Sequence, residues 1–331
     1  MSKLSVVIPA FNEREGVAQV VERLLAVRDA LWLEAGIRDL EILVVDDGST
    51  DGTGSVVARL AEARSNGRAT VRLLRHGQNR GYGAALQTGF AKSRGSLLAF
   101  LDADNTYPPE YLPALCRIAR TPGTGLVLGD RMSSGLSQMP ALRRLGNALF
   151  ATLTSLLAGR RVADCCSGMR VLPLATWREL GPLPEGLDFT PAMTIRALHR
   201  EVTLREVQIP YHERVGRSKL KVARDGLRFL LTILHETWVH KPARLWALAR
   251  PVGVSVLGLV GVSFALATAY ELPWACVGIS LLLGTAACLV GLSLLGWGAS
   301  PRPRPVALRP TAAGAAPVGR ATRREEEQAH S

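Results

Sequence analysis

Short apolar runs alternate with longer amphipathic stretches along the first 130 residues of the chain. The apolar runs, which are rich in Val, Leu and Ile and have the length of buried strands, cover residues 4–8, 41–45, 71–75, 97–101 and 126–128. Between these runs, apolar residues recur with helical spacing at 16–35, 52–64, 83–93 and 109–120. This alternation predicts an α/β, Rossmann-like domain with a mostly parallel sheet, whose ligands gather at the carboxyl ends of the strands.

Polar residues are concentrated in the four loops that follow the first four strands. Their sequences are PAFNE at 9–13, DDGSTDG at 46–52, NRGYG at 79–83 and DAD at 102–104. The last of these ends a buried run on two carboxylates, Asp102 and Asp104, separated by a single small residue. That spacing lets both carboxylates reach one hard cation, and Mg²⁺ or Mn²⁺ usually shares such ligands with substrate phosphates.

The other loops have a composition that suits a nucleotide diphosphate. Acids after the second strand can accept hydrogen bonds from a base or a ribose, and the glycine-rich loop allows close backbone approach. Turn capping is the alternative role for Asp46 and Asp47. A dinucleotide-binding fingerprint is excluded by position, because Gly81-Tyr-Gly83 follows the third strand and lacks a third glycine. A Walker A motif does not occur in the sequence.

The last third of the chain has a different composition. Residues 252–270 and 272–297 carry no charge, are separated by Glu271, and are each long enough to cross about 30 Å of hydrocarbon. They predict a transmembrane helical hairpin, with a pair of buried core helices as the alternative. Leu and Trp at helical spacing in 225–250 predict amphipathic juxtamembrane helices, or else helices packed on the preceding domain. We therefore divide the chain into a domain at 1–224, juxtamembrane helices at 225–250, a hairpin at 251–298 and a disordered basic tail at 299–331.

The net charge of +12 is concentrated on both sides of the predicted hairpin. Residues 214–250 include nine basic and two acidic side chains, and residues 301–331 include six and three. By the positive-inside rule, the N-terminal domain and both termini face the cytoplasm, in a multi-pass protein of the cell (inner) membrane. Basic residues beside a bilayer contact anionic lipids, so we do not expect nucleic acid as a partner.

The five cysteines show neither zinc-ligand spacing nor a disulfide framework, as in a reduced cytosolic domain.

Four segments in order, SVVIPAFNE, EILVVDDGSTDGT, NRGYGAALQTG and LDADNTYPPE, resemble the GT-A domain of family two glycosyltransferases. The resemblance runs from about residue 4 to 230 and is specifically to polyprenyl-phosphate sugar synthases of the dolichol-phosphate mannose synthase type. It implies a membrane-anchored, inverting enzyme that moves a sugar from a nucleotide-diphosphate sugar to a polyprenyl phosphate, with Mg²⁺ or Mn²⁺ as cofactor.

The resemblance also assigns residues to the donor half of the site. It implies nucleotide binding by Pro9, Phe11, Asn12, Glu13, Asp46, Asp47, Asn79, Gly81 and Asp102. It implies metal binding by Asp102 and Asp104, with Thr106 as a possible third ligand.

Four later segments, at 129–131, 143–147, 164–170 and 214–220, combine cations with small or hydroxyl-bearing neighbours. Converging Arg and Lys side chains can hold a phosphomonoester, and these segments include the G-x-R, D-x-x-S-G-x-R and R-x-G-x-S-K patterns of the family. The residues assigned to the acceptor phosphate are Arg131, Arg143, Arg144, Ser167, Arg170, Arg214, Ser218 and Lys219. The phosphate nucleophile is already ionised, so catalysis by Asp102, Asp104, Arg131 and Arg214 needs no general base.

One position departs from the family pattern. We expect a glutamate just before Met193, where this chain has Ala192, and Asp188 is a candidate replacement. Two other functions stay open: a processive polysaccharide synthase, whose Q-x-x-R-W motif does not occur here, and a non-catalytic membrane protein that binds a nucleotide sugar or acts as a scaffold. The sequence does not specify the sugar, the base, the polyprenol, the pathway or whether the chain forms a homo-oligomer.

Overall fold

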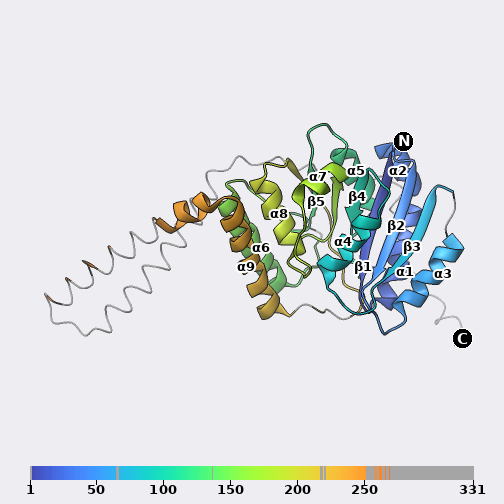
Figure 1. Ribbon diagram of the computed structural model, residues 1–331, viewed down its shortest axis with the longest axis horizontal. Coiled ribbons are helices and arrows are strands. Elements are labelled where there is room, and N and C mark those ends of the chain that lie inside the picture. Colours follow the sequence, from blue (N-terminus) through green and yellow to red (C-terminus); the bar gives the residue numbers. More distant parts are fainter. Residues whose placement is uncertain are drawn as a thin grey trace, which may run out of the picture.

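The computed structural model describes residues 2–64, 67–135, 137–216, 219 and 221–250, with five isolated positions between 258 and 268. Within this part of the chain, seven strands form one sheet in the order β3-β2-β1-β4-β6-β5-β7 (Figure 1). The strands are β1 (Lys3–Ala10), β2 (Asp39–Asp46), β3 (Ala69–Arg75), β4 (Leu97–Phe100), β5 (Leu126–Asp130), β6 (Arg170–Pro173) and β7 (Leu204–Gln208).

The sheet is mostly parallel, as the sequence predicted. β1 lies parallel to β2 and β4, β2 to β3, and β5 to β7. The exception is β6, which runs antiparallel to both β4 and β5. All five predicted strands are present, but β6 and β7 were not predicted. Their sequences carry a weak strand pattern, because RVLP has four residues and LREVQ is interrupted by two charged residues.

Helices cover both faces of the sheet. They are α1 (Arg14–Ala26), α2 (Arg28–Ala35), α3 (Thr53–Arg64), α4 (Tyr82–Lys92), α5 (Leu112–Ala119), α6 (Ala141–Ala158), α7 (Leu174–Leu180), α8 (Phe189–His199) and α9 (Val222–His240), with a short 3₁₀ turn, η1 (Pro109–Tyr111), before α5. The single helix predicted for 16–35 is in fact two helices that meet at Val27. The other predicted helices agree to within a few residues.

The alternation of side chains along β1 separates two hydrophobic cores. Val6 and Ile8 pack with α1, α2, α3 and α5 on one face, while Val7 packs with α4 and α8 on the other. On α4, a Cβ at Gly89 would lie 2.3 Å from a methyl group of Val7. Glycine is therefore required for α4 to approach the sheet closely enough to bury Val7.

α9 packs against α6 and α8 at the end of the molecule remote from β3 (Figure 1). Ile233 joins Leu157 of α6 and Ile195 of α8 in a small third core. The opposite face of α9 exposes Leu227, Leu231, Trp238 and Val239, each more than half accessible to solvent. α9 therefore packs on the preceding domain with one face and exposes an apolar face on the other, and its juxtamembrane position stays a prediction.

Residues 242–250 continue as a helix after α9. No helix in the described part of the chain is long and apolar enough to span a bilayer. The predicted hairpin at 252–297 lies outside the described residues apart from a few isolated positions, and so does the predicted tail at 299–331.

Candidate active site

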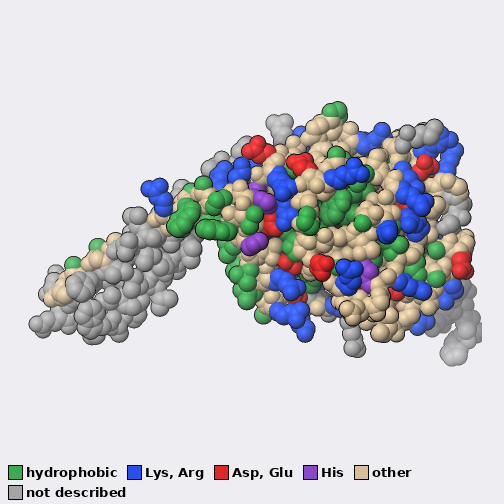
Figure 2. All heavy atoms as spheres, in the orientation of Figure 1, with side chains coloured by type: hydrophobic (Ala, Val, Ile, Leu, Met, Phe, Trp, Pro, Cys, Tyr) green, Lys and Arg blue, Asp and Glu red, His purple; other side chains and the backbone are tan. Residues whose placement is uncertain are grey.

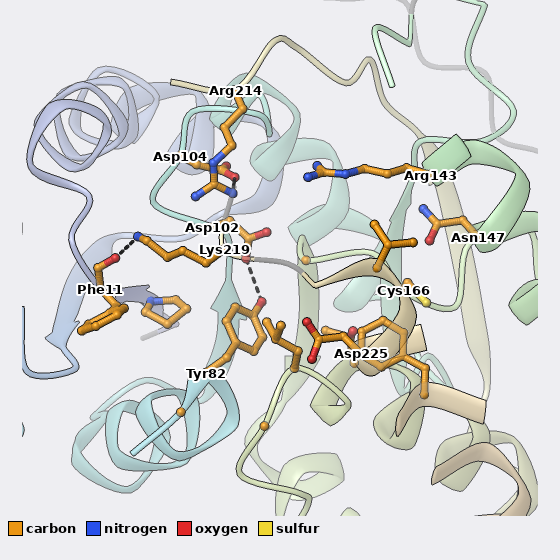
Figure 3. Close-up of a pocket in the computed structure, with 18 of the residues that line it drawn as sticks. Phe11, Tyr82, Asp102, Asp104, Arg143, Asn147, Cys166, Arg214, Lys219 and Asp225 are labelled. Atoms are coloured by element: carbon orange, nitrogen blue, oxygen red, sulfur yellow. Dashed lines mark hydrogen bonds and ion pairs between the residues drawn. The ribbon is translucent and has the colours of Figure 1, made fainter. Parts of the chain in front are cut away.

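A cavity of about 570 Å³ lies between the carboxyl ends of the central strands and helices α6 and α9 (Figure 3). Twelve of the residues predicted from the sequence line it. They are Pro9, Phe11, Glu13, Asp47, Asn79, Gly81, Asp102, Asp104, Arg131, Arg143, Arg214 and Lys219. The structure thus brings most of the predicted donor residues and half of the predicted acceptor residues to one place.

Six predicted residues do not line this cavity. They are Asn12, Asp46, Thr106, Arg144, Ser167 and Arg170. A seventh, Ser218, lies outside the described residues.

The two acids after β2 have different roles. Asp46 accepts a hydrogen bond from the backbone N–H of Ser49 at 2.9 Å, which is the turn-capping alternative. Asp47 is buried and accepts hydrogen bonds from the backbone N–H groups of Arg80 at 2.9 Å and Gly81 at 2.8 Å. Asp47 therefore fixes the glycine-rich loop after β3 against the loop after β2.

The loops after β1 and β2 are joined by Asn12. Its side-chain oxygen accepts a hydrogen bond from the N–H of Thr50 at 2.8 Å, and its own N–H donates to Ser49 Oγ at 2.9 Å. Its φ of 51° is in the left-handed region, where Asn is one of the few tolerated residues besides glycine. Asn12 thus holds the loop after β1 against the loop after β2.

Asp102 is held at the centre of the cavity by its neighbours. The hydroxyl of Tyr82 donates a hydrogen bond to Asp102 Oδ1 at 2.7 Å (Figure 3). A Cβ at Gly168 would lie 2.6 Å from Asp102 Oδ2, so a larger residue there would displace the Asp102 carboxylate. Desolvation, followed by the charge of Asp104, raises the pKa of Asp102 to about 7. The cations and hydrogen-bond donors around the two carboxylates therefore do not fully compensate their negative charge.

Both carboxylate oxygens of Asp104 accept hydrogen bonds from side chains. Thr106 Oγ1 donates to its Oδ1 at 2.6 Å, and Arg214 Nη1 donates to its Oδ2 at 2.7 Å. Thr106 is fully buried behind Asp104, so this geometry favours it as a support for that carboxylate over a direct metal ligand. The Arg214 cation is thus already drawn to Asp104, and two carboxylates at this spacing suit a divalent cation.

Arg214 and Lys219 fold back over the donor edge. Arg214 Nη2 also pairs with Glu13 Oε1, and Lys219 Nζ donates to the same oxygen at 2.8 Å and to the carbonyl oxygen of Asn12 at 2.9 Å. Lys219 also contacts the carbonyl oxygen of Phe11 (Figure 3). Burial raises the pKa of Glu13, whereas Lys219 and Arg214 each lower it. Two of the predicted acceptor cations, Arg214 and Lys219, thus lie on carboxylates predicted for the donor side.

Arg131 is fixed much more firmly. Its guanidinium makes two hydrogen bonds to Asp164, Nε to Oδ2 at 2.6 Å and Nη2 to Oδ1 at 2.8 Å. It also lies over the rings of Tyr107 and Tyr211, 5.5 and 5.3 Å from their centroids. Burial by itself would lower the pKa of Arg131, but Asp164 raises it well above its usual range. Arg131 is therefore a permanent cation in a preset orientation.

The other predicted cations have structural contacts. Arg170 is fully buried, donates to the carbonyl oxygens of Ser167 at 2.9 Å and Cys165 at 2.8 Å, and lies over the ring of Phe100. It therefore orders the 164–170 loop from inside the domain. Arg144 donates to the carbonyl oxygen of Met132 at 3.3 Å.

Sequence reasoning missed several residues of the cavity. Tyr82 and Tyr107 lie inside quoted motifs and could have been found there. Asp225, at the start of α9, lines the cavity and is 2% exposed, but no sequence signal pointed to it. Asp188, the candidate replacement for the missing glutamate, does not line the cavity and accepts a hydrogen bond from Thr232 Oγ1 at 2.9 Å.

Two curated proteins of Haloferax volcanii resemble this chain. It is 31% identical over 268 residues to the low-salt glycan biosynthesis hexosyltransferase Agl6, a match covering 79% of this chain and 59% of Agl6. It is 32% identical over 222 residues to dolichyl-phosphate hexose transferase, covering 66% of this chain and 86% of the relative. The chain thus spans less than two thirds of Agl6 and most of the second relative.

The fold also matches a solved structure. Glucosyl-3-phosphoglycerate synthase from Mycobacterium tuberculosis, in complex with Mn²⁺, UDP-glucose and phosphoglyceric acid, superposes with a TM-score of 0.54 at 20% identity. The match covers 71% of this chain and 80% of the synthase, and it establishes the shared GT-A-like fold. Residues 5–176 match the family described as glycosyl transferase family 2. The family expected from the four loop sequences is confirmed: this chain belongs to glycosyl transferase family 2.

Proposed function

We propose that this chain transfers a sugar, with inversion, from a nucleotide-diphosphate sugar to a polyprenyl phosphate at the cytoplasmic side of the cell membrane. The observation that carries the proposal is the composition of the cavity. One wall presents the carboxylate pair Asp102 and Asp104, and the same cavity is lined by Arg131, Arg143, Arg214 and Lys219. A site with both groups of charges suits a diphosphate leaving group and a phosphate nucleophile.

The donor half would bind the nucleotide at the ordered loops. Phe11, Asn79 and Gly81 line the side of the cavity next to Asp47. Asp102 and Asp104 would hold Mg²⁺ or Mn²⁺, which supplies charge neutralisation for the departing nucleoside diphosphate. The solved synthase with Mn²⁺ and UDP-glucose has the same fold, and this supports the metal assignment.

The acceptor half would bind an anionic phosphate. Arg131 is held in place by Asp164 and stays positively charged. Arg214 neutralises Asp104 in this structure, and a metal ion bound to Asp104 would take over that role. Once released from Asp104, the Arg214 fork could hold phosphate oxygens. Because a phosphate oxygen is ionised at neutral pH, positioning and charge neutralisation suffice for the reaction.

The membrane placement rests on two features. Three leucines on α6, Leu142, Leu145 and Leu149, are each more than half exposed and lie on one face of the helix, and α6 contacts α9, which also exposes apolar residues. Figure 2 shows hydrophobic side chains along this end of the molecule, interspersed with Lys and Arg. Such a surface suits the interface of an anionic bilayer. Together with the charge-free stretches at 252–270 and 272–297, this surface supports the proposal of a multi-pass protein with both termini in the cytoplasm.

The topology has a direct test in intact cells. An engineered cysteine beside Glu271 should be labelled from outside by a membrane-impermeant reagent, and one at residue 310 should not. The opposite labelling pattern would refute the orientation.

The activity is tested by incubating the purified full chain with a panel of nucleotide sugars, Mg²⁺ or Mn²⁺, and undecaprenyl or dolichyl phosphate. Mass spectrometry of the lipid fraction should show the polyprenyl phosphate plus one sugar. A series of masses separated by one sugar would instead indicate a processive synthase. Binding of a nucleotide sugar without lipid-linked product would indicate the non-catalytic alternative.

A further inference from the structure

We infer that Asp225, in the first turns of α9, determines donor specificity by accepting hydrogen bonds from hydroxyl groups of the transferred sugar. The inference rests on the proposed function of this cavity. It adds a residue that lies far along the chain from every donor-side motif.

The position of Asp225 in the cavity is the first argument. In Figure 3 its carboxylate points into the cavity on the side of Asp102 away from Phe11. A nucleotide sugar has its diphosphate between the nucleoside and the sugar ring. If Phe11 marks the nucleoside and the carboxylate pair marks the diphosphate, the sugar extends toward Asp225.

The second argument is the incomplete neutralisation of this buried carboxylate. Asp225 Oδ2 accepts a hydrogen bond from the N–H of Lys221 at 2.8 Å. Among the described residues, the cation paired with Oδ1 is Arg224, whose Nε is 3.6 Å away and whose side chain is 69% exposed. An exposed ion pair of this kind contributes little, whereas burying a carboxylate without hydrogen bonds is costly. Sugar hydroxyls are donors that would satisfy the remaining oxygen.

The third argument is the assignment of the other acids in the cavity. Glu13 is paired with Arg214 and Lys219, and Asp47 with two backbone amides. Asp102 and Asp104 belong to the metal pair. Of the described acids that line the cavity, Asp225 is the one left for sugar hydroxyls.

Helix capping is the competing explanation, because an acid in the first turn stabilises a helix and Asp225 accepts the Lys221 N–H. The variant Asp225→Asn separates the two roles. Its amide oxygen can still accept the Lys221 N–H, but the negative charge is lost. Asp29→Asn is the matched control, since Asp29 is also in the first turn of a helix, α2, and its side chain is 81% exposed, outside the cavity.

The experiment compares affinities by calorimetry in the full chain with Mn²⁺. The ligands are UDP, GDP, UDP-glucose, UDP-galactose and GDP-mannose, then deoxy analogues of the sugar that binds best. We expect Asp225→Asn to bind the nucleoside diphosphate within about twofold of the wild type and to bind the preferred nucleotide sugar about 10- to 100-fold more weakly. One deoxy analogue should be bound equally by the wild type and the variant, and Asp29→Asn should match the wild type throughout.

Other results would overturn the inference. Unchanged affinity for the preferred nucleotide sugar would leave Asp225 with a capping role only, and an equal loss for the nucleoside diphosphate would indicate a general disturbance of the site. The binding measurements need no acceptor, so they stand even if lipid-linked product is absent and the proposed acceptor is wrong. A wild type that binds no nucleotide sugar would refute both proposals.

Discussion

The loops after β1, β2 and β3 form one side of the cavity, and their polar groups are fixed by hydrogen bonds between neighbouring loops, as Asp47 and Asn12 illustrate. The basic side of the cavity instead consists of cations held by carboxylates from distant parts of the chain: Asp164 holds Arg131, and Asp104 and Glu13 hold Arg214. The loops are therefore ordered by the protein's own hydrogen bonds. The basic side holds its charges in internal ion pairs, some of which a bound phosphate would have to displace.

Arg131 and Arg214 show the two extremes of this basic side. Arg131 is 7% exposed, makes a double hydrogen bond to Asp164 and lies over two tyrosine rings. The Arg214 side chain is 23% exposed and belongs to the loop that follows β7. The difference indicates that Arg131 is part of the scaffold of the site, and that Arg214 can move between partners.

The largest expected effect tests the scaffold role of the Arg131 pair. Asp164→Ala leaves a buried guanidinium without its carboxylate, so the free energy of unfolding should fall by roughly 3 to 5 kcal/mol. Chemical denaturation of the purified chain measures this loss. The double variant Arg131→Met, Asp164→Leu should recover most of it. A loss below about 1 kcal/mol in the single variant would mean that Arg131 is not fixed by this pair.

The second prediction concerns the carboxylate pair. Asp102→Asn and Asp104→Asn should each reduce sugar transfer by at least about 10²-fold, since each removes a charge that stabilises the departing diphosphate through the metal. EDTA should stop the wild-type reaction, and Mg²⁺ or Mn²⁺ should restore it. Asp29→Asn serves as the charge-removal control. Full activity in metal-free buffer would disprove the metal assignment.

The third prediction separates Arg214 from Arg131. Arg214→Ala should weaken the use of polyprenyl phosphate by about 10- to 150-fold, the equivalent of roughly 1.5 to 3 kcal/mol for a charge-assisted hydrogen bond. Its free energy of unfolding should fall by less than that of Asp164→Ala, because the Arg214 side chain is 23% exposed whereas that of Arg131 is 8% exposed. Arg214→Lys should recover part of the activity, since a point charge lacks the planar fork. Loss of nucleoside diphosphate affinity with normal lipid kinetics would place Arg214 on the donor instead.

The smallest expected effect is a pH dependence caused by Asp102. Its folded-state pKa of about 7 is above the unfolded value of 3.8, so the folded protein holds this proton more tightly. The resulting stabilisation is present at low pH and is lost as the pH rises through about 7. In EDTA, Asp102→Asn should therefore gain stability relative to the wild type between about pH 5 and 8, by on the order of 1 kcal/mol. A stability difference that does not vary with pH would contradict the raised pKa.

Local patterns predicted the parallel half of the fold and the donor side of the cavity. A buried strand has a recognisable apolar run, and the carboxyl ends of parallel strands must share an edge, so strand order and loop composition are enough to bring Asp47, Asn79 and Asp102 together. The same reasoning failed for β6 and β7, whose short sequences become strands by pairing with the sheet, β6 between β4 and β5 and β7 beside β5. It also joined α1 and α2 into one helix.

The sequence by itself determined which residue types are available to the site, and the tertiary structure decided which of them meet. Arg170 and Arg214 both match basic motifs, yet one is buried inside the domain and the other lies on the carboxylate pair. Asp225 enters the cavity on a helix that follows the sheet domain, while Asp188, in the motif region, bonds to that helix instead. The partner of a charged side chain depends on how segments far apart in the chain pack, and periodicity and motif spacing carry no information on that packing.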